Sequence, residues 1–170
     1  MTIGNFADRL KLPGLLYVDV YPFFINEEGK IEFLIFQRRD DVALANSWQP
    51  VCGTIVKDEP FSHAFVRQVK TKTGQIPCDL WKLAMVNVYY DDYYDTVMLV
   101  PTAFCRLKER KVVIDDSLHK KHKWVTNDEA KKWLVWPQQC NCVERIQSLL
   151  TIPDTNHFLS LLKLSFNKIL

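Results

Sequence analysis

The side chains that suggest chemistry gather in residues 53–76, GTIVKDEPFSHAFVRQVKTKTGQI. Gln68, Thr71 and Lys72 are spaced i, i+3, i+4, so in a helix they share one face. That face offers an amide, a hydroxyl and an ammonium group. A unit charge and a divalent ion about 4 Å apart repel by up to ~8 kcal/mol at an effective dielectric of ~20, so Lys72 opposes metal binding there.

The same stretch resembles the Nudix box, G-x5-E-x7-R-E-U-x-E-E-x-G-U, where U is a bulky apolar residue. The resemblance extends from about Leu15 to Leu150 and is greatest to the bacterial dihydroneopterin triphosphate pyrophosphatases and related nucleoside triphosphate pyrophosphohydrolases. It implies an α+β fold in which a mixed β-sheet lies between α-helices. The retained box positions are Gly53, Glu59, Arg67, Val69 and Gly74.

The resemblance also shows which groups are missing. In the family, metal-binding glutamates occupy the positions of Gln68, Thr71 and Lys72, and a further acid, in an E-H-x4-K-W pattern, falls on Leu118. Mg²⁺ requires hard oxygen ligands and is commonly shared between carboxylates and substrate phosphates. No catalytic position is intact, so we expect no metal site and no cofactor of the family kind.

Three functions remain open for such a chain. The first is a pseudoenzyme that keeps a nucleotide-binding, phosphate-binding or interaction surface. The second is an active hydrolase of nucleoside triphosphates or dihydroneopterin triphosphate whose Mg²⁺ or Mn²⁺ is held by relocated ligands. The third is an architectural subunit with an empty cleft. Metal-dependent turnover would distinguish the second from the others.

Basic residues predict an anion site beside the box. Arg38 and Arg39 end a strand and enter the loop that faces the box, and arginines there often contact phosphates in the family. Lys72 would supply a fixed positive charge in place of the metal. Arg67 could join them, although an internal pair with Glu59 is the simpler interpretation.

Other polar and aromatic groups carry weaker hypotheses. An acidic tip between two strands could hold a relocated metal, but clustered acids at a turn are usually solvated. The histidines lack ligand spacing and are expected at the surface. The tryptophans are expected in the core and rim and not in a base-stacking platform. Tyrosines beside the tip could stack on an aromatic ring. These groups are Asp91, Asp92 and Asp95; His63, His119 and His122; Trp48, Trp81, Trp124, Trp133 and Trp136; and Tyr89, Tyr90, Tyr93 and Tyr94.

Residue patterns predict the elements that position the box. Apolar and β-branched runs around the Gly29 turn indicate a β-hairpin, and two further runs around the acidic tip indicate a second one. Pro60 and Gly74 bracket a helix. The expected strands are 15–24, 31–36, 80–90, 96–107 and 123–125, and the expected later helices are 127–133 and 142–150.

Composition limits the remaining possibilities. The chain has 170 residues, 48% of them apolar, and a net charge of +2, which fits one globular domain without a polybasic arm for nucleic acid or membranes. We expect no leader and no membrane-spanning run, and a cytoplasmic protein whose five cysteines are reduced.

We predict a Nudix domain over residues 1–150 and an apolar helical extension over residues 151–170. The extension is too apolar for one narrow helical stripe, so it should pack on its own domain, on a homodimer mate or on another partner. Its apolar positions are Phe158, Leu159, Leu161, Leu162, Leu164, Phe166, Ile169 and Leu170.

Overall fold

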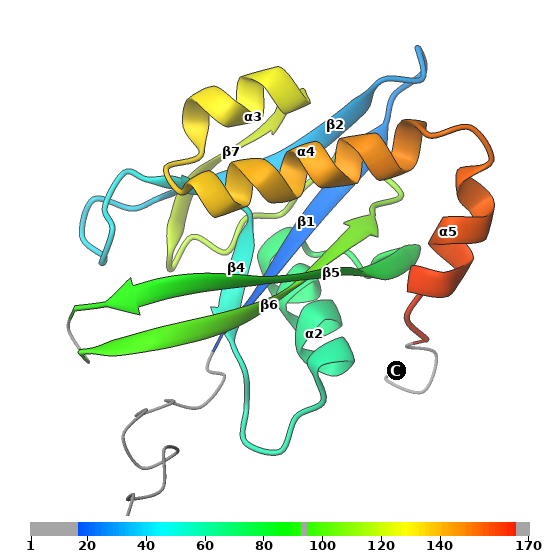
Figure 1. Cartoon of the computed structure of the whole chain (residues 1–170). Helices are drawn as coiled ribbons and strands as arrows, with labels where there is room; N and C mark the ends of the chain where they lie inside the picture. The colour runs from blue at the N-terminus through cyan, green and yellow to red at the C-terminus, as the bar shows by residue number, and fades with distance from the viewer. Residues whose placement is uncertain (1–16, 93–94, 166–170) are drawn as a thin grey trace, which may run out of the picture.

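The computed structural model describes residues 17–92 and 95–165. Within these residues a mixed seven-stranded sheet lies between α2 on one face and α3 and α4 on the other (Figure 1). This arrangement confirms the predicted α+β sandwich. The elements are β1 (Tyr17–Ile25), β2 (Ile31–Arg38), β3 (Trp48–Gln49), β4 (Val51–Thr54), α2 (Phe61–Thr73), β5 (Asp79–Asp91), β6 (Thr96–Arg106), β7 (His119–Val125), α3 (Asn127–Trp133), α4 (Pro137–Thr151) and α5 (Thr155–Leu162).

Both predicted hairpins form. The main strand order is β3-β2-β1-β6-β5, with β4 paired to β1 and β7 paired to β2. β1 runs parallel to β6 and antiparallel to β2 and β4. The β5–β6 ribbon has a register shift between Lys82 and Val86. Tyr93 and Tyr94, at its predicted tip, lie outside the described residues.

The core divides into two layers because successive strand side chains point to opposite faces. Val18 and Val20 of β1 pack with Ala64 and Val69 of α2. Tyr21 of β1 lies in the other layer, against α4. The sheet is therefore buried on both faces, and α2 has one fixed orientation relative to β1 and β4.

Helix α2 begins and ends where the sequence indicates. Pro60 precedes it in an extended conformation, and the Ala64 N–H donates to the Pro60 carbonyl at 3.0 Å. Gly74 has φ of 73° and its N–H donates to the Lys70 carbonyl, which ends the helix in the left-handed conformation that glycine adopts most readily.

Two later elements are longer than predicted. β7 begins at His119 instead of Lys123, because its residues pair along β2 as far as Arg38. α4 begins at Pro137 instead of Cys142, and proline suits the first turn, where its missing N–H has no helical partner. α3 has the predicted bounds, with Thr126 and Glu129 forming a capping box.

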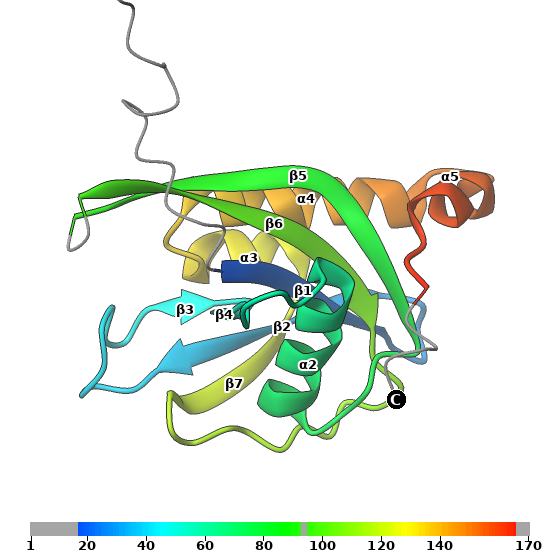
Figure 2. The ribbon, with the colours of Figure 1, turned by 90° about the horizontal axis from the view of Figure 1, so that it is seen from below.

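The C-terminal extension folds back beside the edge strand β5 (Figure 2). The Leu164 N–H donates to the Leu80 carbonyl at 2.9 Å, and Lys163 Nζ lies 2.8 Å from Asp79 Oδ1. Leu159 and Leu162 pack against the core, but Phe158 and Leu161 remain exposed. Phe166, Ile169 and Leu170 lie outside the described residues, and the 1–150 and 151–170 division stays a prediction. No helix within residues 17–92 and 95–165 is long and apolar enough to cross a membrane.

Candidate functional site

A bidentate ion pair between Arg67 and Glu59 ties the loop before α2 to the helix. Arg67 donates from Nε to Glu59 Oε1 at 2.7 Å and from Nη2 to Glu59 Oε2 at 2.6 Å, and Nη2 also donates to the Thr54 carbonyl. The Val56 N–H donates to Glu59 Oε2. Hydrogen bonding to Arg67 lowers the pKa of Glu59. Both box residues are thus used internally, and Arg67 does not join the predicted anion site.

Gly53 leaves the space that Gln68 fills. A Cβ atom at position 53 would lie 2.0 Å from Gln68 Cδ. The Gln68 side chain is buried there and donates from Nε2 to the Thr54 carbonyl at 2.8 Å. The neutral amide therefore acts as a structural bridge between α2 and β4.

Lys72 is buried and paired with Asp115, which lies between β6 and β7. Its Nζ is 2.7 Å from Asp115 Oδ2, and only 6% of the lysine side chain is exposed, against 21% for the aspartate. Asp115 Oδ1 also accepts from the backbone N–H and the hydroxyl of Ser117. Hydrogen bonding to Lys72 and Ser117 lowers the pKa of Asp115 to about 2. Thr71, the third residue of the predicted face, is exposed.

Sequence spacing did not identify Asp115 as a partner, because 43 residues separate it from Lys72. The only local signal is the Asp-x-Ser spacing, which is typical of a side-chain-capped turn. The pair changes the interpretation of Lys72: its charge is matched by a carboxylate of the same chain.

The prediction that His119 lies at the surface is wrong. His119 is 1% exposed because it begins β7 and packs on the Phe36 ring, with ring centroids 5.1 Å apart. Gln49 Nε2 and His119 Nε2 lie 3.2 Å apart, and His119 Nδ1 has no hydrogen-bond partner within the described part of the chain. Burial, reinforced by the positive charges of Lys72 and Arg38, lowers the pKa of His119 to about 4. Its neighbour Leu118 is half-buried, and its carbonyl accepts from the Arg39 N–H.

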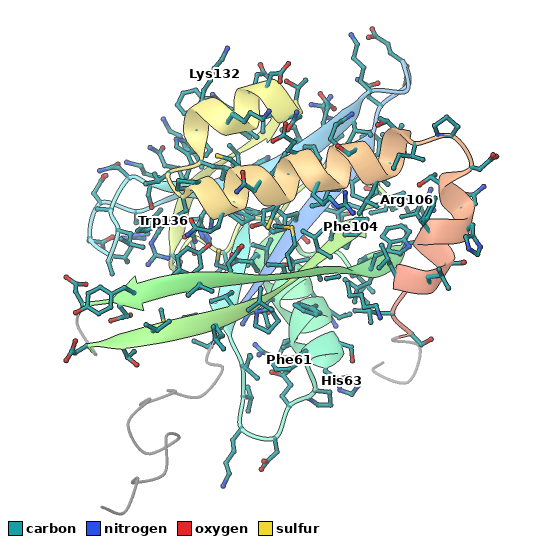
Figure 3. The ribbon with its side chains drawn as sticks, in the orientation of Figure 1. Phe61, His63, Phe104, Arg106, Lys132 and Trp136 are labelled. Atoms are coloured by element: carbon teal, nitrogen blue, oxygen red, sulfur yellow. The ribbon has the colours of Figure 1, made fainter. Side chains whose placement is uncertain are left out.

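The other two histidines differ from each other. His122 is half-buried beside the Phe36 ring, and His63 lies at the start of α2, far from α3 and α4 (Figure 3).

Trp48 and Trp81 are buried as predicted, whereas Trp133 is 40% exposed beneath Lys123 Nζ, which lies 3.8 Å from its ring centroid. The tryptophans therefore divide between the core and the rim.

A cavity of about 430 Å³ opens beside His119. Its wall includes Arg39 and Lys120, which pair with Asp41 and Asp40, respectively. Arg39 Nη1 also donates to the Asp116 carbonyl at 2.9 Å. The cavity is thus lined by both apolar and charged groups, and its cations are already hydrogen-bonded.

Arg38 is the candidate cation without a carboxylate partner within residues 17–92 and 95–165. Its Nε donates to the Ala43 carbonyl at 2.6 Å, a contact that leaves the positive charge uncompensated. Its charge acts on His119 and on Cys52, as does that of Lys72. Arg38 and Lys72 therefore lie near the same buried groups, and the anion site stays a prediction.

Asp19 of β1 is a buried carboxylate that was not predicted from the sequence. Asp19 accepts from Asn87 Nδ2 at 2.9 Å and from the Tyr89 hydroxyl at 3.3 Å. Burial raises its pKa. Its position on an apolar strand was the available signal, because an isolated acid in such a run needs polar partners from other strands.

The residues present do not fit a family-type metal site. Lys72 and its ion pair occupy the helix face, and no group of three or more His, Cys, Asp or Glu residues within the described ranges is arranged to hold a metal ion. At the acidic tip, Asp95 accepts a hydrogen bond from the Tyr90 hydroxyl. All five cysteines are free thiols.

A sheet lies between helices, and the Arg67–Glu59 ion pair ties the preceding loop to α2. This combination defines a Nudix-type sandwich. Solved structures share this fold. They include a NUDIX hydrolase from Listeria monocytogenes (20% identity, TM-score 0.70, 79% of this chain and 93% of that one) and the NUDIX domain of Shewanella oneidensis NrtR complexed with ADP ribose (18%, 0.67, 81% and 88%). A third is a C. elegans Ap4A hydrolase (18%, 0.65, 79% and 96%).

The sequence profile of the NUDIX domain matches residues 16–145, and the chain belongs to this family. No curated protein matches the chain significantly.

Proposed function

We propose that this protein is a Nudix-fold pseudoenzyme that binds a nucleotide or another phosphate-bearing small molecule without hydrolysing it. The buried Lys72–Asp115 pair carries the proposal. It fills the helix face where the family resemblance places metal-binding glutamates. A divalent ion there would have to displace an ammonium group from its carboxylate.

The binding half of the proposal rests on the groups near the cavity. Arg38 keeps an uncompensated charge, and His119, Arg39 and Lys120 line a cavity open to solvent. Guanidinium groups bind phosphate oxygens in a planar, two-pronged geometry. One structural neighbour is complexed with ADP ribose and another is an Ap4A hydrolase, so ADP-ribose and ATP are suitable first probes.

The purified protein should release no product from ATP, dihydroneopterin triphosphate or ADP-ribose when Mg²⁺ or Mn²⁺ is present. The reason is that Gln68, Thr71, Lys72 and Leu118 provide no carboxylate for the metal. Chromatography of the reaction mixture, compared with a buffer control, measures this. Turnover that a chelator abolishes would reject the pseudoenzyme and select the hydrolase with relocated ligands.

ATP or ADP-ribose should bind without divalent ions, and Arg38→Gln should weaken binding roughly tenfold, since a charge-assisted hydrogen bond contributes ~1.5–3 kcal/mol. Isothermal titration measures both affinities. Lys70→Gln is the matched control, because Lys70 is an exposed cation of α2. Added salt should weaken the wild-type affinity.

Three titration results would count against the binding proposal. Absence of metal-free binding by the wild type would leave the architectural subunit as the better account. Equal losses in Arg38→Gln and Lys70→Gln would show general charge attraction instead of a site. An unchanged affinity in Arg38→Gln would move the ligand elsewhere.

A further inference from the structure

The outer part of the β5–β6 ribbon has an apolar face. Cross-strand register pairs Val86 with Pro101, Val88 with Leu99 and Tyr90 with Val97. Directly opposed side chains lie on the same face of an antiparallel ribbon. Four of the six are largely exposed: Val86 53%, Val88 47%, Tyr90 66% and Val97 43%. We call these six residues the ribbon face.

The ribbon face is on the same side of the sheet as α2. Further along the strands, Ala103 and Cys105 of β6 pack in the core layer beneath α2. Asn87 of β5 points the other way, toward Asp19 and Cys142. Figure 2 shows the ribbon extending beyond α2, so this helix does not cover its outer part. Contiguous apolar surface of this kind usually has an occupant.

We propose that residues 1–16 of the same chain dock on the ribbon face. This inference is independent of the proposed ligand-binding function. It concerns a surface on the ribbon, and its support comes from strand register, composition and charge.

The described chain begins close to this surface. β1 begins at Tyr17 and runs parallel to β6, with Asp19 opposite Thr102. Thr102 follows Pro101 of the ribbon face in β6, so residues 1–16 join the described chain two positions before this strand pair. Neighbouring strands are about 4.8 Å apart, so the chain enters β1 within side-chain reach of the ribbon face.

The sequence of the segment suits the surface. Residues 1–16, MTIGNFADRLKLPGLL, include six large apolar side chains besides the first methionine. These residues are Ile3, Phe6, Leu10, Leu12, Leu15 and Leu16. Arg9 and Lys11 exceed Asp8 by one positive charge, whereas the ribbon ends in the acidic group Asp91, Asp92 and Asp95. Apolar complementarity with opposite charge at the rim favours this segment as the occupant.

A double-mutant cycle tests the contact. The first change is deletion of residues 2–13, and the second is Val88→Thr with Val97→Thr, which keeps β-branched shape but adds polar hydroxyls. We expect the threonine pair to lower the Tm of the full chain by about 2–6 °C and to have almost no effect in the deleted chain. Both valines are exposed in the described structure, so their replacement should leave the fold intact.

Ile25→Thr with Val113→Thr is the matched control. Ile25 is 43% exposed at the far end of β1 and Val113 is 64% exposed beside the end of α2, so their effect should be the same in both chains. Hydrogen exchange gives a second readout: deletion should increase exchange of the amides in Thr96–Val100 more than in β2.

Two outcomes would overturn the proposal. Equal Tm losses from Val88→Thr with Val97→Thr in the full and the deleted chain would show that residues 1–16 do not cover the ribbon face. A wild-type dimer in light scattering that the threonine pair dissociates, and the deletion does not, would assign the face to a second copy.

Discussion

Asp115→Asn should lower the free energy of unfolding by about 2–3 kcal/mol, because it leaves the buried Lys72 ammonium without its counter-charge. Breaking a buried pair by removing one partner costs ~3–5 kcal/mol, and we expect less here since 21% of the Asp115 side chain is exposed. Urea unfolding followed by tryptophan fluorescence measures the change. The corresponding decrease in Tm is roughly 5–10 °C.

Asp116→Asn is the matched control for this variant. Asp116 is an exposed neighbour of the same charge, and its contact with Arg39 uses the backbone carbonyl, which the substitution keeps. If the two asparagine variants are equally stable, the Lys72–Asp115 pair does not stabilise the fold. Adding Lys72→Met to Asp115→Asn should restore much of the loss, because the apolar methionine removes the stranded charge.

The contribution of this pair also has a predictable pH dependence. The folded pKa of Asp115 is lowered to about 2, below the ~3.9 of an unfolded aspartate. Its stabilisation is therefore present above about pH 4 and is lost as the pH falls through 2. The stability difference between the wild type and Asp115→Asn should narrow over that interval.

Gly53→Ala should destabilise the protein by about 2–3 kcal/mol through a steric effect on Gln68. The new Cβ would lie 2.0 Å from Gln68 Cδ, so the glutamine must leave its buried position and lose its bond to the Thr54 carbonyl. Overpacking costs ~1–3 kcal/mol, and a lost hydrogen bond adds about 1. Urea unfolding again measures the change.

Gln68→Ala tests the cause of the Gly53→Ala effect. Removing the glutamine side chain should make Gly53→Ala much less destabilising, so the double variant should be more stable than the sum of the single effects predicts. Backbone strain does not enter, because Gly53 is outside the left-handed region in which Gly29 and Gly74 lie. Additive effects would contradict the steric account.

The sequence determined the local elements and the family, because these depend on signals between near neighbours. Apolar alternation and the Gly29 turn predicted the first hairpin, and Pro60 with Gly74 predicted α2 to within a residue. The spacing of Gly53, Glu59 and Arg67 indicated the Nudix box, because one loop and one helix contain all three positions.

Only the tertiary structure decided how the altered box residues are used. Sequence spacing placed Lys72 in the box but could not show Asp115, which reaches it from a loop between distant strands. Burial of His119 likewise depends on β7 pairing along the full length of β2. Long-range strand pairing and loop closure set these contacts. Lys72 was expected to supply a free positive charge, but the Asp115 carboxylate matches that charge.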